Sequence, residues 1–234
     1  MKLAGALVTR NYTANPSAFA ALKAMADITL VLDDSMSPTF PHIGDTDEYI
    51  YLRRTGAWND GANRATLLHR AFLHGCDWVL QWDDDLLPSA ELFARVRTLT
   101  NLNADLVYVG LRDLWDDHAH YRIDGLWAHK DYPVLMRNWL FDDKLSLPMP
   151  VRLHRPYAPA HRVPKVVRLQ EDYQVYHFGS LTAERRNQRV AKYAVEDALQ
   201  VYQADYTYLA NEAGLCRADV PAEDLTLMQQ WLPR

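Results

Sequence analysis

The sequence predicts an α/β protein built on an open, mostly parallel β-sheet that is flanked by helices. Two observations support this prediction. Apolar runs of strand length occur at residues 3–8, 28–32 and 78–82, and the first run is continuous, as expected of a strand buried on both faces. Segments of helical character separate these runs, so strands and helices alternate along the first part of the chain, which is typical of parallel sheets.

The helices of this first part have recognisable ends. Pro16 suits the first turn of a helix, where its missing N–H is not needed. Gly75 follows a helical pattern and can adopt the left-handed conformation that ends a helix. Ser89 can accept a hydrogen bond from the first turn of the next helix. We therefore expect helices over 17–26, 63–73 and 89–100, and a short third strand over 49–53.

The second part of the chain is less regular. Residues 113–164 are rich in aspartate and proline and carry no long helical pattern, so we expect loops and short antiparallel strands there. Thr182 can cap a long helix that continues to Ala213, with Gly214 at its end. The other expected elements are strands over 106–111, 166–169 and 173–178, and a short helix within 220–234.

Composition and charge narrow the class of protein. The chain has 234 residues, of which 49% are hydrophobic and 24% are charged, which is enough apolar material for the core of one domain. A net charge of −5 argues against non-specific binding to nucleic acid or to an anionic membrane. Cys76 and Cys216 imply no disulfide framework, and no stretch is long and apolar enough to cross a bilayer. We therefore expect a cytoplasmic protein without a membrane span.

Three consecutive acids, Asp83, Asp84 and Asp85, follow the strand at 78–82. Like charges at such short separation repel one another, so three buried carboxylates need a group that neutralises them. Two interpretations are open: the acids lie on an exposed turn, or they bind a divalent cation. Carboxylate oxygens at the carboxyl end of a strand suit Mg²⁺ or Mn²⁺.

Two further polar segments follow strands of the same sheet. Thr9 to Asn11 comes directly after the first strand, and Asp33 and Asp34 come after the second. Right-handed crossovers place the ends of parallel strands along one edge, which is where open α/β sheets bind their ligands. These two segments and the acidic triplet should therefore converge, although they are far apart in sequence.

The order of these motifs resembles that of family 2-type glycosyltransferases with the GT-A fold. The motifs that carry the resemblance are Thr9-Arg10-Asn11, Asp33-Asp34-Ser35, Asn63-Arg64, the Asp-X-Asp sequence at 83–85, and residues 175–185, which are similar to the family's last strand and the basic helix after it. In the family an Arg-Asn pair opens the helix, whereas the order here is reversed. The likeness covers residues 1–100 and 173–195.

The resemblance implies a metal-dependent hexosyltransferase that moves a sugar from a nucleoside diphosphate donor, a UDP-sugar, with inversion. It implies a Mn²⁺ or Mg²⁺ ion held by Asp83, Asp85 and His177 beside the diphosphate. Asp33 or Asp34 would accept a hydrogen bond from the base. The donor-binding positions that it implies are Thr9, Asn11, Asp33, Asp34, Asn63, Arg64, Asp83, Asp84, Arg185 and Arg189.

The same resemblance divides the single domain into three parts. Residues 1–103 would form the half that binds the nucleotide sugar. Residues 104–180 would form the acceptor side and end in the metal-binding strand, and residues 181–234 would form a helical segment.

An inverting transfer needs a carboxylate that takes the proton of the acceptor. The chain departs from the family pattern at this position. The candidates are Asp116, Asp124 and the pair Asp142-Asp143. We favour Asp124, because the glycine after it permits close approach of a substrate, and we keep Asp143 as a second catalytic candidate.

Two other functions are open. A nucleotidyltransferase on a similar sheet usually has a glycine-rich phosphate loop after the first strand, and Thr9-Arg10-Asn11 lacks the glycines. A non-catalytic protein that binds nucleotides or sugars could have the same sheet. The acceptor of a glycosyltransferase could be a glycan, a lipid-linked sugar, a protein or a modified DNA base, and Trp115, Trp127 and Trp139 could stack on it.

Overall fold

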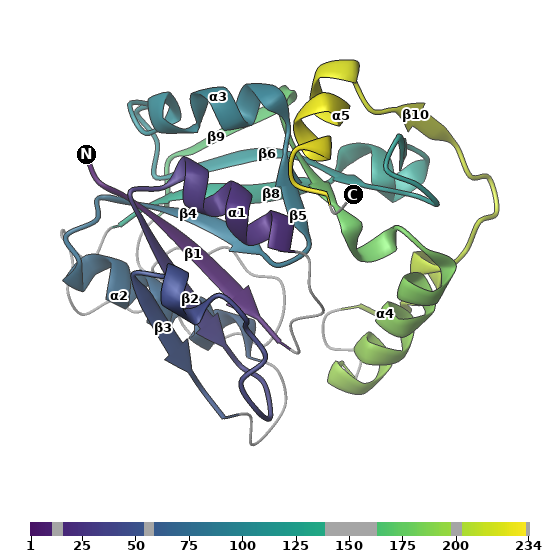
Figure 1. The fold of residues 1–234 in the computed structure, drawn as a ribbon. Helices are drawn as coiled ribbons and strands as arrows, with labels where there is room; N and C mark the ends of the chain where they lie inside the picture. The colour runs from purple at the N-terminus through teal and green to yellow at the C-terminus, as the bar shows by residue number, and fades with distance from the viewer. Residues whose placement is uncertain (11–15, 54–58, 139–162, 198–202, 233–234) are drawn as a thin grey trace.

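The computed structural model describes residues 1–10, 16–53, 59–138, 163–197 and 203–232. An eight-stranded sheet runs through the molecule, and α1 and α3 lie on one of its faces while α2 lies on the other (Figure 1). The helices are α1 (Pro16–Met25), α2 (Asp60–Leu73), α3 (Ala90–Leu99), α4 (Ala183–Glu196) and α5 (Ala222–Gln229). The strands, in spatial order, are β3 (Glu48–Tyr51), β2 (Ile28–Asp33), β1 (Leu3–Thr9), β4 (Trp78–Asp83), β8 (Asp131–Arg137), β6 (Leu106–Asp113), β9 (Val166–His177) and β5 (Leu86–Pro88).

The first half of the sheet is parallel and the second half is mixed. Strands β3, β2, β1 and β4 run in the same direction. Strand β8 is antiparallel to both of its neighbours, β4 and β6, so β6 and its parallel partner β9 share the direction of β4. A separate ribbon pairs β7 (His120–Arg122) with β10 (Arg217–Asp219). The predicted α/β class, with a mostly parallel open sheet flanked by helices, is confirmed.

Strand β1 shows why the sheet must be covered on both faces. Its side chains alternate between the two faces because successive residues of a strand point in opposite directions. Leu3 and Leu7 pack in the cluster that contains α1 and α3, whereas Ala4, Ala6 and Val8 pack in the cluster that contains α2. Every residue of β1 is buried, which matches the continuous apolar run in the sequence.

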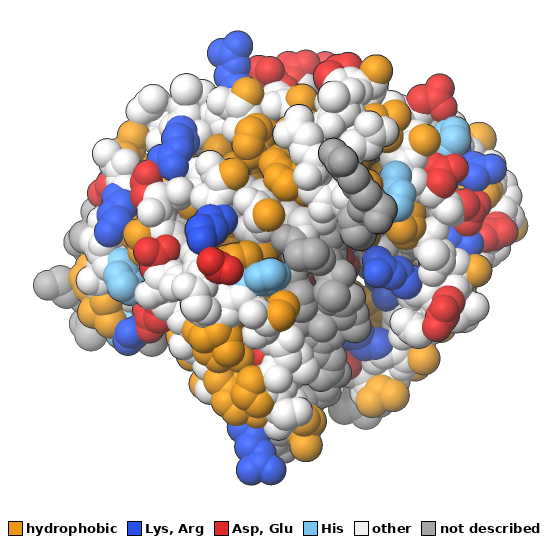
Figure 2. All heavy atoms as spheres, in the orientation of Figure 1, with side chains coloured by type: hydrophobic (Ala, Val, Ile, Leu, Met, Phe, Trp, Pro, Cys, Tyr) orange, Lys and Arg blue, Asp and Glu red, His pale blue; other side chains and the backbone are white. Residues whose placement is uncertain are grey.

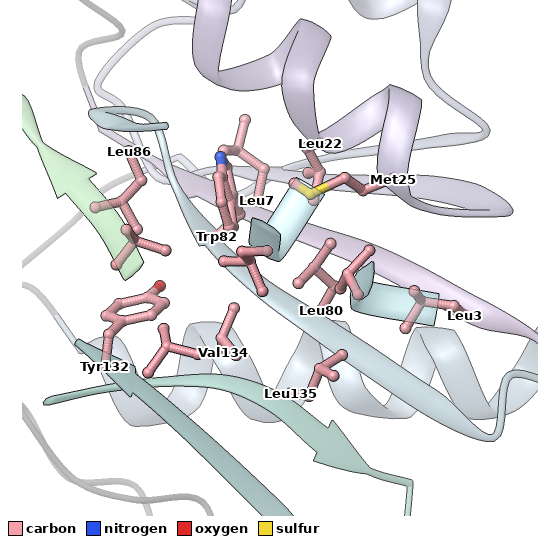
Figure 3. Close-up of a cluster of buried hydrophobic side chains, with 14 of the residues drawn as sticks. Leu3, Leu7, Leu22, Met25, Leu80, Trp82, Leu86, Tyr132, Val134 and Leu135 are labelled. Carbon is pink, nitrogen blue, oxygen red and sulfur yellow. The ribbon is translucent and has the colours of Figure 1, made fainter. Parts of the chain in front are cut away.

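Helix α1 approaches β1 closely at Gly5. A Cβ atom at this position would lie 2.8 Å from two carbons of Leu22, so only glycine leaves room for the helix. Figure 3 shows Leu7, Leu22 and Trp82 in the same buried cluster, and all three side chains are fully inaccessible to solvent. Burying one such side chain contributes about 1.5–3 kcal/mol, so this layer fixes α1 and β4 firmly on β1.

The long helix predicted from Thr182 to Ala213 is wrong in length. Thr182 caps α4 as expected, because its hydroxyl accepts a hydrogen bond from the backbone N–H of Arg185, but the helix ends at Glu196. Asp197 then binds the hydroxyl of Tyr206 at 2.8 Å and the backbone N–H of Gln203 at 3.1 Å. These two contacts hold Gln203 and Tyr206 against the end of α4.

The other expected elements are present, with changes at their ends. Helix α2 begins three residues earlier than predicted, because Asn59 accepts a hydrogen bond from the backbone N–H of Ala62. The two strands predicted over 166–178 form the single strand β9, whose register against β6 is broken between Leu169 and Gln174. Strand β5 was not predicted; its three residues are too few to produce a pattern.

The surface fits the modest negative charge of the chain. On the face drawn in Figure 2, lysine and arginine side chains are interspersed with aspartate and glutamate side chains. Within the described ranges, no helix has the length and apolar character that a bilayer span requires.

Candidate active site

The carboxyl ends of five strands bring the polar segments together along one edge of the sheet. The register pairs Thr9 of β1 with Asp33 of β2, and it pairs Val8 with Asp83 of β4. On the other side of β8, Asp113 at the end of β6 pairs with His177 at the end of β9. This edge is where parallel sheets bind ligands, as the order of motifs indicated.

Each acid of the triplet has its own partner. Asp84 accepts a hydrogen bond from the hydroxyl of Thr9 at 2.6 Å. Asp83 lies 2.6 Å from Arg64, and Asp85 lies 3.0 Å from His177. Burial, reinforced by the neighbouring Asp85 carboxylate, raises the pKa of Asp84. Three adjacent carboxylates are tolerated here because two of them face cations and the third faces a hydroxyl.

Arg64 lies beneath Asp83 and is nearly inaccessible to solvent. Its guanidinium donates to Asp60 at 2.9 Å, to Gln81 at 3.1 Å and to Asp83. The resemblance to family 2-type glycosyltransferases placed Arg64 among the positions that bind the donor. The structure instead directs this side chain at Asp83, whose second oxygen accepts a hydrogen bond from Tyr132 at 3.3 Å.

His177 lies between two carboxylates. Its Nδ1 is 2.6 Å from Asp113, and its Nε2 is 3.0 Å from Asp85. Burial alone would lower the pKa of His177, but the charges of Asp85 and Asp113 outweigh burial and raise this pKa to about 9. Burial would likewise raise the pKa of Asp85, yet the imidazolium of His177 holds it below its usual range. The convergence expected of Asp85 and His177 is therefore present in the fold.

Asp113 is a member of this site that the sequence analysis did not single out. Its carboxylate is buried and accepts from Lys130 at 2.8 Å, from Ser180 at 3.2 Å and from Arg189 at 3.5 Å, in addition to His177. The signal that could have found it is its position, because it ends a strand of the same direction as β4, as Asp33 and Asp83 do. The aspartate-rich sequence after it concealed this signal.

Asp33 and Asp34 differ in their availability. Asp33 is fully buried, and its oxygens accept from the backbone N–H groups of the turn after β2, from the hydroxyl of Ser35 and from that of Tyr49 at 2.9 Å. Asp34 receives hydrogen bonds from Arg10 at 2.9 Å and Asn63 at 3.0 Å, both at Oδ2. Within the described ranges its Oδ1 accepts no hydrogen bond. Asp34 therefore has an acceptor to offer to a ligand.

Helix α4 connects the two ends of this edge. Near its start, Arg185 donates to the carbonyl of Phe178 at 3.1 Å, and Arg189 donates to the hydroxyl of Ser180 at 2.6 Å. At its end, Glu196 forms an ion pair with Arg10 at 3.0 Å, and Arg10 also holds Asp34. Of the two predicted cationic positions of α4, Arg189 thus lies beside Asp113, and Arg185 contacts the residue after His177.

The predicted catalytic carboxylates do not join this group. Arg122 binds both oxygens of Asp124, at 2.8 and 2.7 Å, and this ion pair holds the pKa of Asp124 below its usual range. Such a carboxylate is a poor base, so the geometry gives no support to the choice of Asp124. Asp143, like the donor-binding candidate Asn11, lies outside the described residues.

The tryptophans expected to stack on an acceptor are buried. Trp115 and Trp127 pack edge to face at 5.4 Å in a core cluster. The guanidinium of Arg186 covers the ring of Trp115 at 4.1 Å, and the ammonium of Lys130 covers that of Trp127 at 3.5 Å. These cation–π contacts occupy the faces that a sugar would need. Trp139 lies outside the described residues.

Replacing Gly179 with alanine is expected to disrupt the pair formed by Asp85 and His177. A Cβ atom at Gly179 would lie 2.6 Å from Cε1 and Nε2 of His177 and 3.1 Å from Asp85. Because the ring is held by Asp113, we expect a loss of about 1–3 kcal/mol in the free energy of unfolding, measured by urea denaturation. Gly44→Ala is the matched control, since a Cβ atom there meets nothing within 4 Å. Equal stability of the two variants would contradict this geometry.

The comparisons with known proteins bear on the fold. The sequence matches no protein-family model and no curated protein. The crystal structure of S. aureus TarS matches with a TM-score of 0.50 and 14% identity over 84% of this chain and 40% of that one, so the chain spans about two fifths of the length of TarS. HddC from Yersinia pseudotuberculosis matches with a TM-score of 0.46 and 10% identity, over 80% of this chain and 97% of that chain.

A protein from Desulfovibrio desulfuricans G20, provisionally described as a nucleotide-diphospho-sugar transferase, covers 99% of both chains with a TM-score of 0.42 and 10% identity. At these identities the likeness concerns the fold alone. The chain shares its α/β fold with the matched part of TarS, in agreement with the α/β class predicted from its sequence.

Proposed function

We propose that this protein is a metal-dependent glycosyltransferase of the GT-A family 2 type, which transfers a sugar from a UDP-sugar to an acceptor with inversion. One observation carries the proposal. Asp85, in the turn after β4, and His177, at the end of β9, meet at 3.0 Å on the edge of the sheet where ligands bind. A carboxylate and an imidazole at this separation are suited to bind one cation.

The donor set fits an ion that is shared with a substrate. Among the described residues, no group of three or more histidine, cysteine or acidic side chains is placed so that it could hold a metal ion by itself. Mg²⁺ and Mn²⁺ are commonly bound by one or two protein ligands together with substrate phosphates and water. Asp85 and His177 would therefore hold the ion, and the imidazole favours Mn²⁺ over Mg²⁺. A bound ion would neutralise the charge that develops on the departing diphosphate.

The neighbouring residues supply the remaining contacts with the donor. Asp34 Oδ1 would accept a hydrogen bond from the base, and the imide N3–H of uracil is a donor of the required kind. Asp33 supports the turn instead, because its oxygens are occupied. Arg185 and Arg189 would stabilise the diphosphate as it leaves, since charge-assisted hydrogen bonds to phosphate are strong. Arg64 would position Asp83 and would not contact the donor.

Calorimetric titration of the protein with UDP, CDP and GDP, each with and without Mn²⁺, tests the proposal. We expect UDP to bind most tightly and to require Mn²⁺ for its full affinity. A screen of UDP-sugars should then identify one donor from which UDP is slowly released. Pyrophosphate release from a nucleoside triphosphate and a sugar phosphate would identify a nucleotidyltransferase instead. Tight UDP binding without turnover of any UDP-sugar would identify a binding protein.

A further inference from the structure

The contacts of Asp113 single it out within the site. It links His177 to the positive charge of Lys130, the residue before β8, because its Oδ1 faces Nδ1 of His177 and its Oδ2 faces the ammonium of Lys130. The side chain of Asp113 is only 1% exposed. A buried carboxylate without compensation would be strongly disfavoured, so these partners keep it ionised.

The distances indicate a preferred direction for the ring of His177. The contact of Nδ1 with Asp113 is shorter than the contact of Nε2 with Asp85, 2.6 Å against 3.0 Å. Ser180 and Arg189 also approach the same oxygen of Asp113, at 3.2 and 3.5 Å, which limits its movement. The ring is therefore anchored at Nδ1, and its Nε2 is presented towards Asp85.

We propose that Asp113 is a positioning residue that holds the proton of His177 on Nδ1, so that the Nε2 lone pair is directed at a cation bound by Asp85. This inference rests on the proposed function. A histidine that binds a cation through Nε2 keeps one ring proton, which must then lie on Nδ1. Carboxylates that accept this proton fix the tautomer and raise the basicity of the ligand. Lys130 supports the arrangement by neutralising Asp113 from the other side.

The substitution Asp113→Asn separates this role from simple packing. The asparagine amide has nearly the same shape, but its NH₂ group can donate to Nδ1 and favour the tautomer with the proton on Nε2. Losing such a partner typically weakens metal binding roughly 10–100-fold. Asp117→Asn is the matched control, since Asp117 lies 2.8 Å from Nδ1 of His120 and the substitution makes the same chemical change at an aspartate–histidine pair outside this group.

The experiment is a calorimetric titration of Mn²⁺ into the wild-type protein and both variants at saturating UDP, with urea denaturation of each. We expect a roughly 10–100-fold weaker Mn²⁺ affinity for Asp113→Asn only, with UDP binding in the absence of metal unchanged. Unchanged Mn²⁺ affinity in a folded Asp113→Asn variant would overturn the inference. If the wild-type protein itself bound no Mn²⁺ with UDP, the proposed function would fail first, and the inference with it.

A measurement on the wild-type protein covers the case in which Asp113→Asn does not fold. With Mg²⁺ and UDP bound, the ¹⁵N resonances of His177 report which ring nitrogen carries the proton. We expect a protonated Nδ1 and an unprotonated Nε2. A protonated Nε2 in the bound state would overturn the inference, whatever the behaviour of the variant.

Discussion

Replacing Asp85 with asparagine is expected to lower sugar transfer about 1,000-fold while leaving the fold intact. The neutral amide is a much weaker ligand than a carboxylate, and it cannot balance the charge of His177 at 3.0 Å. Lewis-acid stabilisation of a leaving group contributes several kcal/mol, and each 1.36 kcal/mol corresponds to a factor of ten in rate. The rate of UDP release from the donor found in the screen measures the effect.

Asp45→Asn is the matched control for this prediction. The carboxylate of Asp45 is 60% exposed and lies 3.7 Å from Lys23, in the last turn of α1. The same chemical change there should leave the rate and the Mn²⁺-dependent affinity for UDP unaltered. A rate for Asp85→Asn within threefold of the wild-type rate would show that this carboxylate does not hold the ion, and the assignment of the site would have to be abandoned.

The sequence predicts the edge of the sheet well because burial on both faces leaves a strong pattern. A strand such as β1, in which every residue is buried, must be apolar throughout, so its polar end is conspicuous. Parallel direction then places Thr9, Asp33 and Asp83 along one edge without further information. The meeting of Asp85 and His177 was implied by the resemblance to family 2-type glycosyltransferases and not by this pattern.

The parts that the sequence does not predict depend on partners distant in the chain. The sequence indicates the interruption of β9 as a gap between two strands, but only the pairing with β6 shows that the two pieces form one strand with a shifted register. The early end of α4 is set by the hydrogen bond of Asp197 to Tyr206, which competes with good helix-forming residues. Asp113 has no motif of its own, and its importance follows from its contacts with His177 and Lys130, which are distant in the sequence.

The sequence also does not predict which of Asp33 and Asp34 can accept a hydrogen bond from the base. Two adjacent acids at a strand end are equivalent in a sequence pattern, so the base contact was assigned to either. In the fold they point to different surroundings, since Asp33 supports the turn that precedes β3 while Asp34 lies beside Arg10 and Asn63. Alternation along a strand explains the difference, because consecutive side chains leave the backbone on opposite sides.

Replacing Arg64 with methionine is expected to lower the free energy of unfolding by about 3 kcal/mol. The guanidinium donates to Asp60, Gln81 and Asp83, and the substitution leaves these three acceptors without this partner. Breaking a buried ion pair costs about 3–5 kcal/mol, because an uncompensated charge is left behind. We expect the lower end of this range, since the side chain of Asp83 is 31% exposed and water can reach it. Urea denaturation measures the change.

Arg95→Met provides the control. It removes an arginine from an ion pair with Glu91, which lies on the surface and has the same i,i+4 spacing as the pair of Asp60 and Arg64. Arg95 and Glu91 are 59% and 45% exposed, whereas Arg64 and Asp60 are 8% and 12% exposed, so solvent screens the first pair and not the second. Exposed pairs contribute about 0–1 kcal/mol, and the two variants should therefore differ clearly in stability. Equal losses would mean that Asp83 and Asp60 do not depend on Arg64, and that the acidic triplet is held in place by the strand alone.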